Sequence, residues 1–195
     1  MTNTYPNRRL SLWKKAMRWM RGLGHERGFG LQSPFAYRFV TEVVCQRWPY
    51  YGYEQLHRRW PDADSRERKL CQLLFRLANM RQPRKVFVDA HHADMLWAYV
   101  KGGCLSATTT DDPSQADMLV VDAVTLSPEQ AAETGGRLHG CQLLALLGIC
   151  RDDESMKVWQ ALSTARTCGP AFELYRHGLI YADEAMHRQD YIINA

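Results

Sequence analysis

The stretch Lys85-Val86-Phe87-Val88-Asp89-Ala90 is a short apolar run, rich in valine, that ends in an acid. The stretch Met118-Leu119-Val120-Val121-Asp122-Ala123 repeats that pattern 33 residues later. Each run is too short for a typical helix, and each therefore predicts a buried strand. Helical patterns follow both runs, around residues 95–100 and over residues 127–136. Strands that alternate with helices predict the α/β fold class, with a parallel sheet covered on both faces.

Further strands are expected along the second half of the chain. Residues 105–110 are a candidate second strand, and residues 142–149 are a third buried strand with a helix over residues 153–165 behind it. Two final runs, residues 171–181 and 189–194, are separated by a polar turn. We predict that these two runs form an antiparallel β-hairpin at the edge of the sheet.

The first half of the chain predicts helices. Residues 12–21 place apolar residues on one helical face and lysines and arginines opposite. Ser33-Pro34 is a helix cap followed by a proline at the first helical position, so a second helix should run to about Cys45. The aromatic run over residues 48–53 indicates a loop that leads into a short helix, and residues 65–79 predict a long one.

The pattern changes at Pro83. We therefore divide the chain into a helical N-terminal cap region, residues 1–82, and a sheet domain, residues 83–195, which we expect to pack as one compact unit. The chain of 195 residues is 46% hydrophobic with a net charge of +4, which excludes a disordered protein.

Composition also indicates where the protein works. No apolar run approaches the roughly 18 residues that a membrane helix needs, and the N-terminus lacks the hydrophobic region of a signal peptide. Six cysteines are scattered without a Cys-x-x-Cys pair. Such thiols suit the reducing cytoplasm better than a disulfide framework or a structural zinc site. We expect a cytoplasmic protein with no membrane span.

Charge is divided unevenly along the chain. Residues 1–85 hold 18 Lys/Arg against 6 Asp/Glu, whereas residues 86–195 hold 7 against 15. A basic arm of this kind could bind nucleic acid or an anionic membrane surface. The basic and acidic halves would, however, mostly face each other across one molecule, which argues against a nucleic-acid partner. A basic-arm nucleic-acid-binding protein remains an alternative reading.

Three stretches carry a family resemblance: residues 25–35 (His-Glu-Arg-Gly-Phe-Gly-Leu-Gln-Ser-Pro-Phe), residues 69–88, and residues 172–180 together with 189–193. They resemble the glycine-rich lead-in to the helical cap, the approach to the first strand and the closing hairpin of class I S-adenosylmethionine-dependent methyltransferases, in the O-methyltransferase-like branch common in Bacteroidetes. The resemblance implies a Rossmann-like sheet behind a helical cap, with S-adenosylmethionine as the cofactor.

The turn after the first strand departs from that family. Family members have a glycine-rich turn there, because the backbone must pass close to the cofactor. This chain has Asp89-Ala90-His91-His92-Ala93-Asp94-Met95, without glycine. We interpret Asp89 and His91 as vestigial cofactor-binding residues. Adjacent side chains are expected to diverge, so the two histidines should fill or cap the turn rather than share a metal ion.

The chain is also shorter than the family pattern after the second strand. Family members place a ribose-binding acid there, followed by a helix, a third strand and another helix. Only the seven residues from Asp111 to Asp117 separate the candidate second strand from the next apolar run. A parallel crossover normally takes at least about 10 residues. Either a βα repeat is missing or residues 105–110 are not a parallel strand. Asp111 or Asp112 could replace the ribose acid, and we take Asp112 as the vestigial candidate.

Asp122 matches the position of a metal-binding acid in metal-dependent relatives. Its partner acids would follow residues 142–149, where the chain instead has Leu147-Gly148-Ile149. Asp152 and Asp153 come later and suit the N-terminus of a helix. We therefore expect no metal and treat Asp122 as a vestigial cofactor-site candidate or a loop cap.

These patterns favour a methyltransferase-like protein with a degenerate S-adenosylmethionine site. We expect no cofactor and a non-catalytic binding or scaffold role toward an unknown protein or small molecule, with homo-oligomers allowed. The alternative is an active methyltransferase with a rebuilt site that uses S-adenosylmethionine.

Overall fold

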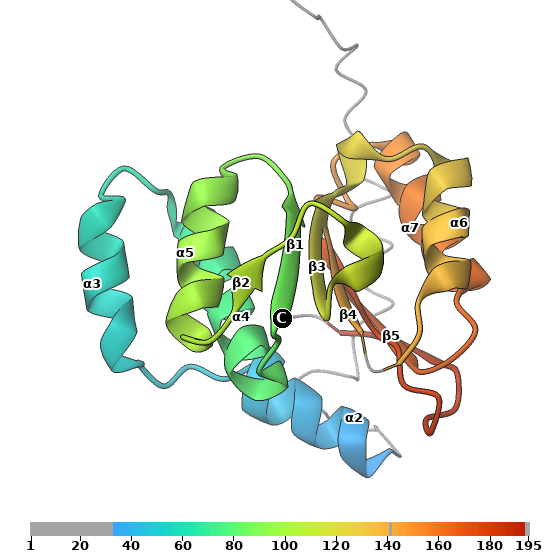
Figure 1. Cartoon of the computed structure of the whole chain (residues 1–195), viewed down its shortest axis with the longest axis horizontal. Coiled ribbons are helices and arrows are strands. Elements are labelled where there is room, and N and C mark those ends of the chain that lie inside the picture. The colour runs from blue at the N-terminus through green and yellow to red at the C-terminus, as the bar shows by residue number, and fades with distance from the viewer. Residues whose placement is uncertain (1–32, 141, 194–195) are drawn as a thin grey trace, which may run out of the picture.

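The computed structural model describes residues 33–140 and 142–193, so the helix expected over residues 12–21 lies outside the described residues. The described chain forms six α-helices and one seven-stranded mixed sheet with the order β2-β1-β3-β4-β6-β5-β7. Figure 1 shows the sheet between two groups of helices. The α/β fold class predicted from the sequence is confirmed.

The first four strands of the sheet are parallel, as the two apolar runs predict. β1 (Lys85–Asp89) and β3 (Met118–Asp122) lie side by side, with β2 (Thr108–Thr109) outside β1 and β4 (Leu143–Leu147) outside β3. The candidate second strand is therefore parallel, but it contains only two residues. The connection from β2 to β3 has no α-helix, only the 3-10 turn η3 (Pro113–Gln115).

The terminal hairpin lies elsewhere than predicted. Residues 171–181 do not form one strand: β5 (Pro170–Leu174) and β6 (His177–Tyr181) are themselves an antiparallel hairpin. β7 (Gln189–Ile192) then pairs with β5 in parallel. The prediction that residues 189–194 form the second arm of the hairpin was wrong, because Tyr175 adopts a positive φ of 50° and makes the turn without glycine or asparagine.

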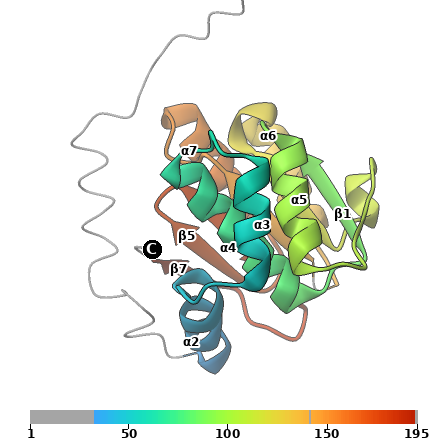
Figure 2. The ribbon, with the colours of Figure 1, turned by 90° about the vertical axis from the view of Figure 1, so that its left-hand side faces the viewer.

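The two faces of the sheet carry different helices. One face packs against α2 (Pro34–Phe39), the π-helical turn η2 (Val40–Val44), α4 (Ser65–Arg81) and α5 (Ala93–Gly103). The other face packs against α6 (Pro128–Arg137) and α7 (Asp153–Ala165). α3 (Tyr51–Arg59) lies outside the first group, and Figure 2 shows it in front of α4 and beside α5. Helices from before Pro83 thus share a core with the sheet.

Side-chain caps begin the helices where the sequence predicts. The Ser33 hydroxyl accepts from the Ala36 amide, with Pro34 as the first helical residue. Asp64 and Glu67 form a capping box at the start of α4. The Asp152 carboxylate accepts from the Ser155 amide at 2.7 Å, so its predicted role as the cap of α7 is confirmed.

Each helical layer contains a close backbone approach at a glycine. A Cβ on Gly103 of α5 would collide with the carbonyl of Phe75 in α4. A Cβ on Gly135 of α6 would collide with the carbonyl of Leu162 in α7. The absence of a side chain at these two positions lets both helix pairs pack closely.

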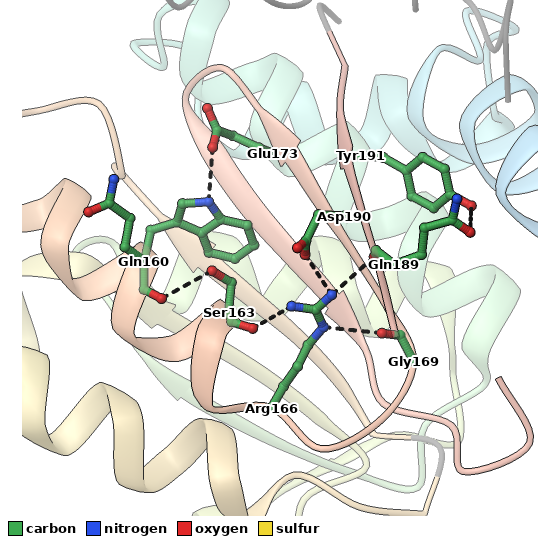
Figure 3. A network of polar contacts seen from close by, with 9 residues as sticks. Gln160, Ser163, Arg166, Gly169, Glu173, Gln189, Asp190 and Tyr191 are labelled. Carbon is green, nitrogen blue, oxygen red and sulfur yellow. Dashed lines mark hydrogen bonds and ion pairs between the residues drawn. The ribbon is translucent and has the colours of Figure 1, made fainter. Parts of the chain in front are cut away.

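Arg166, directly after α7, is only 1% exposed and fastens that helix to the last strands. Its guanidinium donates to the carbonyls of Ser163, Gly169 (3.1 Å) and Gln189 (3.1 Å) and forms an ion pair with Asp190 at 2.5 Å. Figure 3 shows these partners converging on the buried arginine from three segments of the chain. Among the described residues, no helix is both long and apolar enough to span a membrane.

Candidate functional site

The order of the strands reverses between β1 and β3. The chain passes from β1 through α5 to β2 on one side, then crosses back to β3 on the other side of β1. In open α/β sheets, ligands bind outside the carboxyl ends of the strands at such a reversal. Asp89 ends β1 and Asp122 ends β3, so two of the predicted site residues lie at this point.

His91 and His92 form the turn between β1 and α5. Both are exposed, and the His92 carbonyl accepts from the amides of Met95 and Leu96 at the start of α5. His92 has a positive φ of 59°, and the two rings lie 4.0 Å apart between centroids. The expectation that these side chains diverge was wrong, because the left-handed residue turns both imidazoles to the same side.

The turn is also connected to α4. His92 Nε2 lies 3.5 Å from a carboxylate oxygen of Glu67, in the first turn of that helix. The described residues nevertheless contain no group of three or more His, Cys, Asp or Glu side chains that could hold a metal ion. The polar cluster at the end of β1 consists of two imidazoles and one acid from α4, beside the exposed Asp89.

Asp122 is buried, with 5% of its surface exposed. One carboxylate oxygen accepts from the Val124 amide at 3.3 Å, and the other forms an ion pair with Arg151 at 3.3 Å. A Cβ at Gly148, which has a φ of 73°, would lie 3.3 Å from the same carboxylate. The ion pair and the glycine together connect the end of β3 to the segment between β4 and α7.

The register of the strands separates the two acids. Asp89 pairs with Val121, whose side chain lies in the core beside α6 and α7. Asp122 follows Val121 and therefore leaves the sheet on the opposite face, as Val120 does in the core beside α4 and α5. The two carboxylates thus flank the reversal point from different faces and do not converge on one position.

Asp112 does not reach this edge. Its carboxylate accepts from the amide and hydroxyl of Ser114 and from the side chain of Gln115. These hydrogen bonds hold the pKa of Asp112 below its usual range. Gln115 also accepts from Lys85, the first residue of β1, which lies about 13 Å along the strand from Asp89. The candidate ribose acid is therefore occupied as a turn cap near the amino end of β1.

His177 also lies at this edge, and the sequence does not reveal it. It begins β6, and its Nδ1 accepts from the Gly148 amide at 3.4 Å. Burial, with a smaller contribution from the charge of Arg176, lowers the pKa of His177 to about 4. The ring is therefore neutral at pH 7. Its position in an apolar strand run gave no signal, since only the turn at Tyr175 brings it beside β4.

Comparisons of the chain with models of protein families, with curated proteins and with solved structures found no match. At the carboxyl edge, an exposed acid, two adjacent imidazoles and a buried Asp122 that is paired with the half-exposed Arg151 surround the point where strand order reverses.

Proposed function

We propose that this chain is a methyltransferase-like protein with a degenerate S-adenosylmethionine site, and that it acts as a non-catalytic binding or scaffold module in the cytoplasm. The turn after β1 is the observation that carries the proposal. The left-handed position in that turn, which glycine adopts without strain, holds His92. Two imidazoles thus stand where the family resemblance implies a bare glycine backbone beside the cofactor.

The connection from β2 to β3 supports the same proposal. The resemblance implies a helix, a strand and another helix in this region. Here the chain from Thr109 to Met118 forms only the single turn η3, and Asp112 is hydrogen-bonded within it. The segment that would enclose the ribose of the cofactor is therefore shorter than the resemblance implies. The candidate ribose acid, Asp112, instead caps a turn.

The contacts of Asp122 also support the proposal. Its carboxylate is buried and already engaged by Arg151 and by a backbone amide. A ligand or metal that used this carboxylate would first have to displace the arginine. The pair suits a structural link between β3 and the segment before α7 better than a vacant binding position.

Calorimetric titration of the whole chain with S-adenosylmethionine and S-adenosylhomocysteine tests the proposal. We expect no binding at micromolar concentration for either compound. Micromolar affinity would overturn the degenerate reading and favour an active methyltransferase with a rebuilt site. In that case Asp89→Ala should abolish binding while the protein stays folded, because Asp89 is exposed and its carboxylate is not part of the core.

A further inference from the structure

A separate cavity of about 600 Å³ lies in the helical layer, between the loop of residues 46–50, α3 and α4. Its lining includes none of Asp89, His91, Asp112 and Asp122. The volume is in the range of pockets that hold small molecules. Whatever this cavity binds is therefore independent of the edge of the sheet and of the proposed loss of the S-adenosylmethionine site.

Aromatic rings make up much of the cavity wall. Tyr50 and Tyr53 lie with ring centroids 5.3 Å apart. Trp48 and Tyr51 also line the cavity, although they are 77% and 106% exposed. Exposed tryptophan and tyrosine beside a cavity offer flat apolar faces on which a planar ring can stack.

Arg76 of α4 is a buried cation in the same wall. It is 8% exposed and donates to the carbonyls of Val43 (2.5 Å) and Val44 (3.2 Å) and to the Tyr53 hydroxyl (3.4 Å). Burial raises the pKa of Tyr53, so this hydroxyl is neutral at pH 7. All three partners are thus uncharged, and within residues 33–140 and 142–193 no carboxylate is paired with Arg76.

Arg76 also has donors to spare. A guanidinium carries five N–H groups, and the three contacts use one each on Nε, Nη1 and Nη2. Each terminal nitrogen therefore keeps a second N–H. These two N–H groups can donate to the oxygens of a carboxylate or phosphate.

The remaining charges of the cavity wall leave a positive balance. Arg47 also lines the cavity. The acid in the lining, Glu54, forms an ion pair with Arg58 one turn along α3. Buried cations in proteins are normally paired. Arg76 has no acid partner among the described residues and shares the cavity wall with Arg47, so the two favour an anion from outside the chain.

We propose that this cavity binds a small anion that carries a planar ring, with its phosphate or carboxylate on Arg76 and Arg47 and its ring against Trp48 and Tyr51. Mononucleotides and aryl carboxylates both have this chemistry. The inference goes beyond the proposed function and does not rest on it.

Titration of the full chain with four probes tests this assignment: adenosine 5′-monophosphate, 1-naphthoate, adenosine and inorganic phosphate. Tryptophan fluorescence and calorimetry report binding. We expect one of the two ringed anions to bind about tenfold or more tightly than either adenosine or phosphate alone, because only it engages both parts of the site. A preference for the nucleotide identifies a phosphate, and a preference for naphthoate a carboxylate. Binding of adenosine as tight as that of its monophosphate, or no binding of either anion below millimolar concentration, overturns the proposal.

Variants assign the binding to this cavity. Trp48→Ala, Arg47→Ala and Arg76→Lys should each weaken the preferred anion by about fivefold or more, the last because lysine lacks the planar fork. Tyr37→Ala and Arg66→Ala change an exposed aromatic and an exposed arginine outside the cavity and should leave affinity unchanged. If Arg76→Lys does not fold, Trp48→Ala and Arg47→Ala, at exposed residues of the cavity wall, decide whether the anion binds in this cavity. Equal losses in the cavity variants and the controls contradict the assignment.

Discussion

Arg166 and Arg76 are both buried arginines, and the difference between them separates a structural region from a candidate binding region. Arg166 contacts three carbonyls and also Asp190, which neutralises it. Arg76 contacts two carbonyls and a neutral hydroxyl, with no acid among the described residues. Arg166 is enclosed by the sheet and α7, whereas Arg76 lines a cavity that opens to solvent.

The comparison shows that burial of a charge does not by itself identify a function. A guanidinium with its own carboxylate is complete within the fold. One that has only neutral acceptors is hydrogen-bonded but keeps an unneutralised charge, and it is stabilised further by any anion that reaches it. The two regions therefore respond differently to substitution. Three substitutions test that difference, and the pH dependence of stability tests the buried His177 beside them.

Arg166→Met should have the largest effect. The variant removes the donor for the carbonyls of Ser163, Gly169 and Gln189 at a fully buried position, and unsatisfied buried groups are costly. We expect a loss of about 3–5 kcal/mol in the free energy of unfolding, measured with urea. Arg84→Met, at an exposed arginine, is the control. A loss no larger than that of the control would show that the network contributes little.

Acidification should have the next largest effect on stability. The effect arises from His177, which is neutral in the folded protein. Its pKa of about 4 lies below the ordinary value for histidine, so the unfolded chain binds this proton more readily than the native one. Stability should therefore fall as pH decreases from about 6.5 to 4, by about 3 kcal/mol at most.

The pH dependence of urea unfolding in His177→Gln measures this contribution. The variant should lose less stability over that range than the parent protein. His187→Gln removes an exposed histidine and serves as the matched control. Parallel pH profiles for the parent and His177→Gln would refute the assignment.

Arg76→Met should lower the free energy of unfolding by less than Arg166→Met does. The substitution leaves the carbonyls of Val43 and Val44 without a donor, but it also removes a buried charge that has no acid partner. Water in the adjoining cavity can take over part of the hydrogen bonding. We expect a loss of about 1–2 kcal/mol in the free energy of unfolding, measured with urea. A loss equal to that of Arg166→Met would remove the distinction between the two arginines.

Asp190→Asn should have the smallest effect. The carboxylate is 68% exposed, and ion pairs at such positions contribute little. The variant keeps all three carbonyl contacts of Arg166. We expect a loss of about 1 kcal/mol in the free energy of unfolding, measured with urea, because Asp190 is largely solvated but its removal leaves the buried Arg166 without an acid. No measurable loss would show that Asp190 does not compensate Arg166 and would remove the distinction from Arg76.

Local signals in the sequence predicted most of the fold. The runs that end in Asp89 and Asp122 and the caps at Ser33 and Asp152 each act within a few residues. The hairpin was misassigned because its turn depends on Tyr175 in a left-handed conformation. The turn has no glycine or asparagine, the residues that usually mark such a conformation in a sequence. The parallel pairing of β7 with β5 depends on tertiary contacts that periodicity does not encode.

The candidate sites were less predictable. Asp89 and Asp122 were predicted because each ends a strand-like run and matches an acid position of the resembled family, and the structure has both at the carboxyl ends of parallel strands. Asp112 was not excluded, since only three-dimensional contacts show that Ser114 and Gln115 occupy its carboxylate. The aromatic loop was predicted, but not its cavity, because Arg76 comes from a helix 23 residues beyond Tyr53.

The position of α2 has a consequence for the order of folding during synthesis. Phe39 contacts Phe172 with ring centroids 4.7 Å apart, and Phe35 lies 5.0 Å from Tyr181. These partners are translated more than 130 residues later. While the ribosome makes the intervening chain, the apolar face of α2 has no native surface to cover it. We expect nascent chains that stop before β5 to be captured by chaperones through this segment, and longer chains to be released.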